Sequence, residues 1–235
     1  MLQVTAQSMT QQPVEIFEDI APTYDRTNRV LSGGIDLYWR RKMAMLLPQV
    51  EKIKLLDLAT GTGDQLLALL KHSSTIDQAV GIDLAEEMLK IGRTKLKAYD
   101  QVILQKASAT DIPYPENSYD CATMSFGIRN VDNVLGCLGE IYRVLRPKGR
   151  ALILEFSLPT NKWIQKTYLL YLNKLLPRIG KLISAHEHAY TYLAKTIQSF
   201  PQAEAFCKLM KKAGFSEVKA HPLTFGIVTI YQGEK

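Results

Sequence analysis

The stretch LLDLATGTGD, residues 55–64, decides the fold, because an apolar run ends there in a turn that carries two glycines and a carboxylate. A buried strand that passes through such a turn into a helix is typical of the first unit of an open parallel sheet. In sheets of this kind, ligands bind at the carboxyl ends of the strands. We therefore expect a ligand site at this turn.

Apolar runs and helix-period segments alternate on the C-terminal side of the turn. Strands are expected at IKLLDLA, QAVGID, QVILQKA, YDCATMSF and RALILEF, with helices between them at QLLALLKH, AEEMLKIGRTKLKAY and VLGCLGEIYRVL. This alternation predicts βαβ units and a mostly parallel sheet with helices on both faces. Two last strands, near EVKAHPL and FGIVTIYQ, are too close in sequence for a crossover helix, so we expect an antiparallel pair.

Helical segments flank this core. PVEIFEDIAPTYD and GGIDLYWRRKMAMLLP precede the first strand, and a helical insert over about 160–213 precedes the last two. Pro177, Pro201 and Gly214 are expected to break the insert into pieces, because proline lacks the N–H that a helix interior uses.

The composition limits the compartment and the partners. The 235 residues include 29 Lys and Arg against 23 Asp and Glu, and a net charge of +6 makes an anionic partner or surface plausible. The three cysteines form no CxxC pair and no ligand-spaced cluster with histidine, so we expect reduced thiols and no zinc site. The polar start and the lack of an apolar run of roughly 20 residues predict a cytoplasmic protein without a membrane span.

The chemistry of the turn excludes two phosphate ligands. A P-loop needs a lysine, and none occurs between Lys54 and Lys71. A dinucleotide turn needs a third glycine where Leu66 stands, and Asp64 would repel a pyrophosphate. S-adenosylmethionine fits better, because it carries two cationic groups and a ribose diol. Asp83, at the end of QAVGID, would accept hydrogen bonds from that diol; alternatively it only caps the following helix.

Several segments resemble one family, the S-adenosylmethionine-dependent C-methyltransferases of menaquinone and ubiquinone biosynthesis. They are IFEDIAPTYDRTNRVLSGGIDLYWRR, LDLATGTGD, TMSFGIRNVDN, YRVLRPKGRALILEFS and LTFGIVTIYQGEK, and the similarity runs from about residue 14 to the end. The resemblance implies an α/β, Rossmann-like class I methyltransferase fold with a mostly parallel seven-stranded sheet. It also implies methyl transfer to a prenylated quinol ring, with no metal.

The resemblance implies specific site residues as well. The cofactor contacts fall on Gly61, Thr62, Gly63, Asp83, Ser108, Ala109 and Ser125. The family usually has Asp or Asn at the position of Ser108, but a hydroxyl still donates and accepts. Arg129 is the expected cation beside a quinol oxygen; alternatively it is a surface arginine paired with Asp132.

The family's pattern Asp-x-x-Ser-Tyr-x-Tyr-Leu appears as HEHAYTYL, with Ala189 in place of serine. His186, His188 and Tyr190 are the candidate bases or water-holders, and local packing is the alternative for each. Tyr24 and Asp25 belong to a segment similar to the family's lid, although the proline and acids there also suit the end of one helix and the start of another.

The resemblance divides one methyltransferase domain, residues 1–235, into four parts. These are an N-terminal helical lid (1–48), a cofactor-binding core (53–157), a helical substrate insert (160–213) and closing strands (214–235). The insert would line a channel for the prenyl tail while its basic residues contact anionic headgroups; they are Lys162, Lys166, Lys174, Arg178 and Lys181. An ordinary buried helix face is the alternative.

Two other functions remain open at this point, and a third is disfavoured. Another class I methyltransferase, acting on a lipid or a phenol, would share the fold. A binding module without catalysis would keep the cofactor site. A nucleic-acid partner is not expected, because no base-flipping motif is present and the basic residues are interleaved with leucines. The sequence neither requires nor excludes a homo-oligomer.

Overall fold

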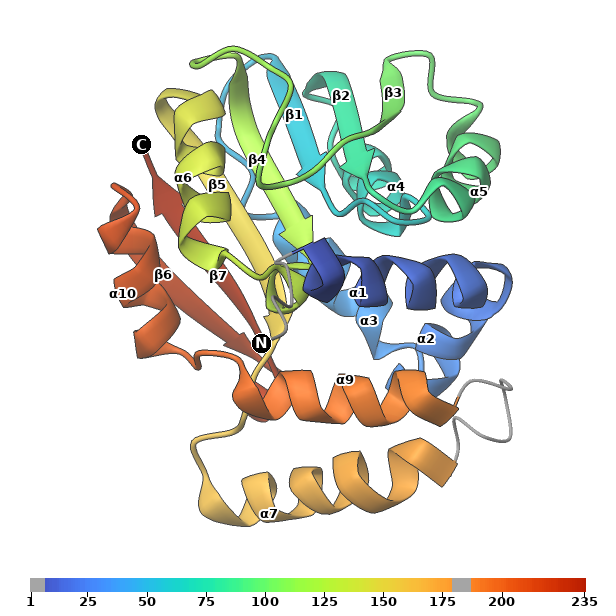
Figure 1. The fold of residues 1–235 in the computed structure, drawn as a ribbon. Coiled ribbons are helices and arrows are strands. Elements are labelled where there is room, and N and C mark those ends of the chain that lie inside the picture. Colours follow the sequence, from blue (N-terminus) through green and yellow to red (C-terminus); the bar gives the residue numbers. More distant parts are fainter. Residues whose placement is uncertain (1–6, 179–186) are drawn as a thin grey trace, which may run out of the picture.

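The computed structural model describes residues 7–178 and 187–235, and the side chains of 14–178 and 191–235. Seven strands form one sheet in the order β3-β2-β1-β4-β5-β7-β6 (Figure 1). The strands are β1 (Ile53–Leu58), β2 (Ile76–Asp83), β3 (Val102–Lys106), β4 (Tyr119–Ser125), β5 (Leu145–Phe156), β6 (Ser216–Leu223) and β7 (Val228–Glu234). β7 runs antiparallel to both β5 and β6, and the other pairs are parallel. The expected mostly parallel sheet and its antiparallel closing pair are confirmed.

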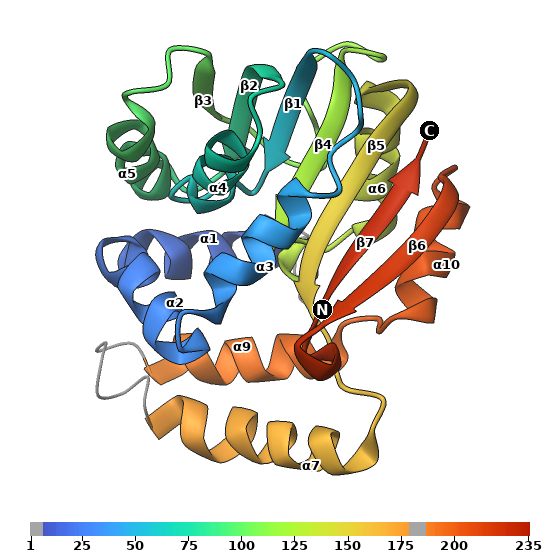
Figure 2. The same ribbon diagram turned by 180° about the vertical axis from the view of Figure 1, so that it is seen from behind.

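Helices cover both faces of the sheet. The helices before and within the core are α1 (Gln7–Ile20), α2 (Tyr24–Ser32), α3 (Ile35–Ala44), α4 (Asp64–His72), α5 (Glu86–Leu96) and α6 (Val134–Val144). The later ones are α7 (Lys162–Leu170), α9 (Glu187–Ser199) and α10 (Glu204–Lys212). α6 and α10 pack against one face, and α3 and α4 pack against the other (Figures 1 and 2).

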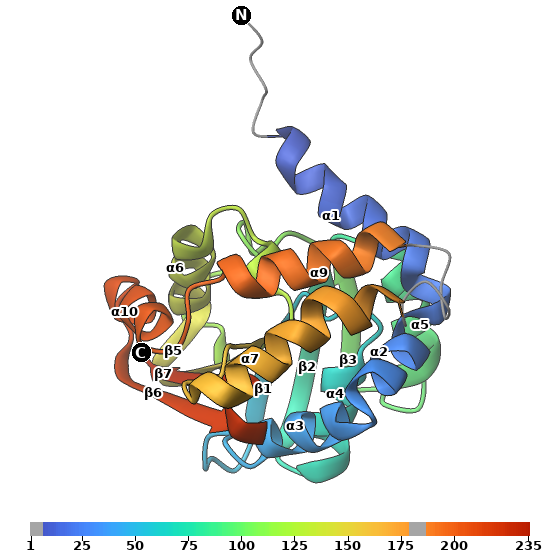
Figure 3. The same cartoon turned by 90° about the horizontal axis from the view of Figure 1, so that it is seen from below.

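Five helices gather beyond the carboxyl ends of the parallel strands. α1, α2 and α3 come from the N-terminus, and α7 and α9 come from the insert (Figures 1 and 3). The turn after β1 therefore faces these helices rather than solvent. We call this group the helical cap.

The cap differs from the sequence prediction in two places. The N-terminal segment contains a further helix, α2, which follows a short 3-10 turn, η1 (Ala21–Thr23), at Pro22. The alternative that one helix ends and another begins at APTYD is therefore confirmed. Pro177 lies within a described helical stretch: a π-helical turn, η3 (Tyr171–Leu175), precedes it and residues 176–178 are helical, where the description of this segment ends. The wider turn is one way in which a helix accommodates an irregularity without ending.

In the part of the chain that the structure describes, no helix is both long and apolar enough to cross a membrane. The cysteines at positions 121, 137 and 207 are free thiols, as the spacing predicts.

Candidate functional site

The turn after β1 is held open by its backbone conformation. Ala59, Gly61 and Gly63 have φ angles of 48°, 55° and 76°, in the left-handed region that favours glycine. A Cβ built on Gly61 would meet no atom within 4 Å. Behind the turn, a Cβ on Gly92 of α5 would lie 3.3 Å from the carbonyl carbon of Thr62, so α5 packs closely there. The turn thus presents bare backbone toward open space.

Asp83 fastens this turn to the end of β2. Its Oδ2 accepts a hydrogen bond from the Gly61 N–H at 2.8 Å, and its Oδ1 accepts one from the Ala85 N–H at 2.9 Å. Burial raises the pKa of the Asp83 carboxyl, and these backbone donors oppose the rise. The capping alternative is wrong, because Ala85 is the N-cap of α5 and Asp83 bonds to no N–H of the helix itself. The Asp83 carboxylate instead lines a cavity.

That cavity, which we call the turn cavity, has a volume of about 510 Å³. Five of the residues expected to contact a cofactor line it together: Gly61, Asp83, Ser108, Ala109 and Ser125. Sequence reasoning missed the apolar part of the wall, which includes Ala59, Leu84 and Met88. The volume lies in the range of small-molecule sites, roughly 300–1,000 Å³.

Thr62 and Gly63 are placed differently. Neither is among the residues that line the turn cavity. The Thr62 hydroxyl donates to Asp25 Oδ1 at 2.6 Å and accepts from Lys95 Nζ at 3.1 Å. A direct contact between the Thr62 side chain and a cofactor stays a prediction. The observed partners of the Thr62 hydroxyl, Asp25 and Lys95, belong to the cap and to α5.

A charge cluster surrounds Thr62. Lys95 Nζ also donates to Asp25 at 2.6 Å and to Asp64 at 2.5 Å, and Arg29 donates to Asp64 at 2.7 Å. Burial alone would raise the pKa of Asp64, but the hydrogen bond from Lys95 and the neighbouring cations lower it. The cluster ties α2, which carries Asp25 and Arg29, to the turn and to α5.

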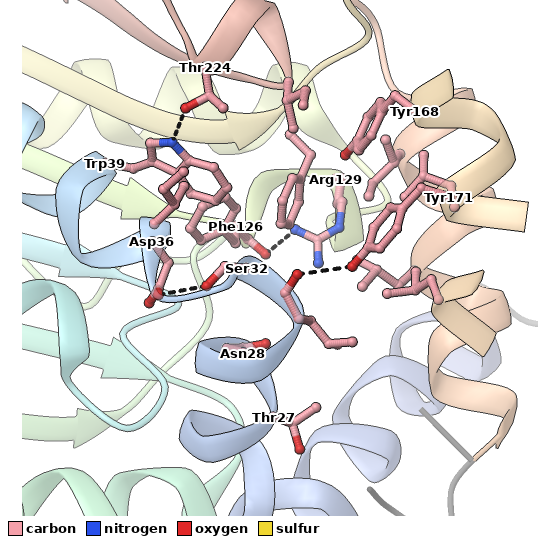
Figure 4. Close-up of a pocket in the computed structure, with 18 of the residues that line it drawn as sticks. Thr27, Asn28, Ser32, Asp36, Trp39, Phe126, Arg129, Tyr168, Tyr171 and Thr224 are labelled. Carbon is pink, nitrogen blue, oxygen red and sulfur yellow. Dashed lines mark hydrogen bonds between the residues drawn. The ribbon is translucent and has the colours of Figure 1, made fainter. Parts of the chain in front are cut away.

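A second cavity, which we call the apolar cavity, lies within the helical cap and has a volume of about 420 Å³. Its wall is mostly aromatic and aliphatic. Most of it comes from α1, α2, α3, α7 and α9, and the rest from the segment after β4, the end of β5, η3 and the turn between β6 and β7 (Figure 4). The aromatic residues include Trp39, Phe126, Phe156, Tyr168, Tyr171 and Tyr192. Such a wall excludes water from a bound molecule.

Arg129 brings a cation into the wall of the apolar cavity. Its side chain is 6% exposed, and its Nη1 donates to Glu155 Oε1 at 2.8 Å and to the Phe126 carbonyl. Its buried Nε has no hydrogen-bond partner among the described residues. Figure 4 shows its guanidinium between Phe126 and Tyr171. The Arg129 side chain is therefore not a surface group, and it pairs with the carboxylate of Glu155.

Glu155 is a residue that the sequence prediction missed. It lies in β5, is 0% exposed, and accepts hydrogen bonds from Arg129 and from the Phe156 N–H. Burial raises its pKa, while the Arg129 charge and these donors oppose the rise. An acidic residue inside the apolar run ALILEF was the available signal, because a buried carboxylate needs a cationic partner.

His186 lies outside the described residues. His188 and Tyr190 lie in α9, but their side chains are outside the described part, so their catalytic roles stay predictions. Tyr24, expected in the lid, lines both cavities, and burial raises the pKa of its phenol. Tyr24 is therefore a neutral hydroxyl at neutral pH, suited to donate a hydrogen bond rather than to act as a base.

The two cavities meet. Phe17, Tyr24 and Phe126 line both of them. Phe126 has a φ of 58°, a strained conformation for an aromatic residue that is found preferentially at functional sites. A molecule in the turn cavity and one in the apolar cavity would therefore touch at this junction.

Known proteins share both the sequence and the architecture. A demethylmenaquinone methyltransferase from Thermus thermophilus is 42% identical over 94% of this chain and 100% of its own. A ubiquinone/menaquinone biosynthesis C-methyltransferase from Geobacter sulfurreducens is 41% identical over 94% and 87%. A solved S-adenosylmethionine-dependent methyltransferase from Thermotoga maritima has the same fold, with a TM-score of 0.66 at 21% identity over 94% of this chain and 99% of that one. The model of the ubiE/COQ5 methyltransferase family matches residues 5–235, and the chain belongs to that family.

Proposed function

We propose that this protein transfers a methyl group from S-adenosylmethionine to a ring carbon of a prenylated quinol. One observation carries the proposal: a cavity with a carboxylate and bare backbone meets an apolar cavity with a buried arginine, at a shared aromatic junction. The relatives' names support it, since one names demethylmenaquinone and another names C-methylation in quinone biosynthesis. Both the menaquinone and the ubiquinone ring belong to this substrate class.

The residues of the turn cavity suit S-adenosylmethionine. The Asp83 carboxylate accepts backbone N–H groups and also lines the cavity, and a carboxylate has about four acceptor sites, so it can accept the ribose hydroxyls as well. The space beside Gly61 admits a ligand close to the backbone, and Ser108, Ala109 and Ser125 line the remaining wall. Gly63 shapes the turn, and a cofactor contact at Thr62 stays our prediction. When bound, the cofactor supplies an electrophilic methyl group on its sulfonium.

Arg129 and its neighbours would prepare the acceptor. A phenolic hydroxyl titrates near pH 10, and a cation beside it favours the ionised form, which makes the adjacent ring carbon a better nucleophile. The unpartnered Nε of Arg129 is a donor for that oxygen, and Glu155 holds the guanidinium in place. His188 and Tyr190 are our candidates for accepting the hydroxyl proton. Dry aromatic walls keep the two reactants in contact.

The proposed roles follow the division of the chain. Residues 1–48 form the lid and 160–213 the substrate insert, because both contribute to the apolar cavity. Residues 53–157 hold the cofactor, and 214–235 close the sheet. A prenylated substrate resides in a bilayer, so we place the protein in the cytoplasm and at the inner face of the membrane during turnover.

Methyl transfer tests the proposal directly. The purified chain is given labelled S-adenosylmethionine with either demethylmenaquinol or a prenylated benzoquinol, and the label is sought on the ring carbon. We expect transfer to at least one of these quinols. Transfer to neither, or label on an oxygen, would contradict the proposal.

Calorimetry tests the cofactor site separately. Asp83→Ala removes both acceptor oxygens, and we expect S-adenosylmethionine to bind about ten- to a hundredfold more weakly, as for lost hydrogen bonds to a charged group. Asp77→Ala is the matched control, since Asp77 lies on the same strand but is exposed and pairs with Lys52. Equal affinity in both variants would rule out the assigned role of Asp83.

A further inference from the structure

Two aromatic side chains stand out on the surface near the apolar cavity, Trp163 on α7 of the cap and Phe225 in the turn between β6 and β7. Trp163 is 79% exposed and Phe225 is 78% exposed. Each is next in sequence to a residue that lines the apolar cavity: Ile164 follows Trp163, and Thr224 precedes Phe225. Exposed apolar groups of this size, gathered at a cavity, are typical of an interaction site.

Hydrogen bonds bring the segments that carry them together. Phe225 lies in η4 (Thr224–Gly226), the turn between β6 and β7. Trp39 Nε1 in α3 donates to Thr224 Oγ1 at 2.7 Å, and Ser157 Oγ donates to the Gly226 carbonyl at 2.8 Å, shortly before α7 begins. The turn therefore lies between α3 and the start of α7, as Figure 3 shows. We call residues 37–42, 158–170 and 222–227 the cavity rim.

The outer face of α7 mixes apolar and basic side chains. Trp163, Lys166 and Leu170 are spaced by three and four residues, so they lie on one side of the helix, and all three are exposed. The opposite side, with Ile164 and Tyr168, lines the apolar cavity. α7 thus separates the cavity from a surface that is both apolar and cationic.

The charge around the rim has one sign. Residues 37–50, 158–178 and 218–233 contain no Asp or Glu. Their basic residues are Arg40, Arg41, Lys42, Lys162, Lys166, Lys174, Arg178 and Lys219. Arg40 is buried, whereas most of the others are exposed. Basic residues beside exposed aromatic groups are the composition that binds anionic bilayers.

We propose that the cavity rim docks on an anionic lipid bilayer, with Trp163 and Phe225 inserted among the headgroups. In this position the part of the cavity wall that holds Ile164 and Thr224 lies beside the bilayer, and a prenyl tail would pass from the bilayer into the protein between α7 and the turn η4. The docking stands on the rim itself, whereas the passage of the tail rests on the proposed function. A second copy of the chain is a poorer occupant, because a twofold contact through this rim brings basic groups opposite basic groups.

Vesicle flotation with the full chain tests the docking. We expect binding to vesicles that contain phosphatidylglycerol, weaker binding to pure phosphatidylcholine, and release by salt. The double variant Trp163→Ala, Phe225→Ala should reduce the partition constant by about tenfold or more, as for two lost aromatic side chains. Ile103→Ala is the matched control, because Ile103 is 61% exposed on β3, outside the rim.

The charged residues are tested in the same way. Lys162→Glu with Lys166→Glu should abolish binding to anionic vesicles. Lys211→Glu with Lys212→Glu on α10 changes the net charge equally outside the rim, and this pair should keep most of the binding. Equal loss in the two pairs would mean attraction by net charge alone and would overturn the docking surface.

Tryptophan fluorescence reports the position of the rim. The chain has two tryptophans, and Trp39 is 4% exposed. A blue shift on vesicle addition should therefore come from Trp163, should be quenched by brominated lipids, and should disappear in Trp163→Phe while flotation persists. Binding without any shift or quenching would show that another surface docks.

Activity with two acceptors separates this proposal from the proposed function. The Trp163→Ala, Phe225→Ala variant should methylate a tail-free quinol in solution at the wild-type rate and a prenylated quinol in vesicles more slowly.

A wild-type protein that binds vesicles but methylates neither quinol would contradict the function and leave the docking intact. Wild-type methylation without vesicle binding, or a double variant that binds as well as wild type, would contradict the docking. A rim variant that only changes a dimer to a monomer in sedimentation would assign the rim to self-association instead.

Discussion

Asp57 is a buried carboxyl in the middle of the sheet, and its state matters for the fold. Its two oxygens accept hydrogen bonds from Thr60 Oγ1 at 2.7 Å and Thr123 Oγ1 at 2.5 Å. Burial raises its pKa from 3.8 to about 6, although these two donors oppose the rise. The native state therefore favours the protonated form, and ionisation of Asp57 destabilises it.

We expect Asp57→Asn to remove this pH dependence. In the wild type, Asp57 contributes most to the free energy of unfolding below pH 4, and this contribution is lost as the pH rises through about 6. The total loss at full ionisation is about 3 kcal/mol. Asparagine cannot ionise, and the threonine hydroxyls can still bond to its amide. Urea unfolding between pH 4 and 7 should show the wild type losing about 2–3 kcal/mol relative to the variant. If the free energies of unfolding of the two proteins changed in parallel with pH, the raised pKa of Asp57 would be contradicted.

Among the elements, α2 depends on the charge cluster rather than on its own sequence. Its segment YDRTNRVLS buries one residue, Thr27, so packing alone holds it weakly. Asp25 and Arg29 instead connect it to Thr62, Asp64 and Lys95. Lys95 is the centre of the cluster, because its ammonium donates hydrogen bonds to Asp25, Thr62 and Asp64.

Lys95→Met should therefore loosen α2 specifically. The variant leaves Asp25 partly buried without its cation, and we expect the free energy of unfolding to fall by about 2 kcal/mol. Hydrogen exchange should accelerate in residues 24–32 and stay unchanged in α6. Lys90→Met on the same helix is the control, because its pair with Glu87 is exposed and such pairs contribute about 0–1 kcal/mol. Similar effects of both variants would mean that the cluster does not anchor α2.

The sequence predicts strands better than it predicts the cap. Buried parallel strands such as IKLLDL and ALILEF form continuous apolar runs, so their positions follow from composition. The helix at YDRTNRVLS is short and polar overall, and long-range contacts stabilise it. Its spaced residues Tyr24, Thr27 and Leu31, which face the apolar cavity, were the signal that the sequence prediction missed. The spacing of residues in the sequence predicted that Asp83 lies at the turn. It could not predict the hydrogen bond from the Thr62 hydroxyl to Asp25, because Asp25 lies in a helix that is distant in sequence.

At the scale of the whole molecule, the sheet and the cap divide the reaction between them. The sheet supplies the ends of β1, β2 and β4, which surround the turn cavity, and the cap supplies most of the apolar cavity. The two meet where Phe17 and Tyr24 of the N-terminal segment reach Phe126 beyond β4. If the reacting ring lies at this junction, its tail must extend away from Phe126, toward the start of α7 and the part of α3 that carries Trp39.

Substituting Ile164 tests this orientation. Ile164 lines the apolar cavity in the first turn of α7, next to Trp163 and away from the junction. Ile164→Trp should narrow the path of the tail, and we expect kcat/KM for a prenylated quinol to fall about tenfold or more, as for a misfit of about 1–3 kcal/mol. The value for a tail-free quinol should change little, because the ring and Arg129 lie deeper. Ile164→Leu preserves the volume and should leave both values near wild type. An equal loss for both quinols in Ile164→Trp would place the ring, rather than the tail, at this end of the cavity.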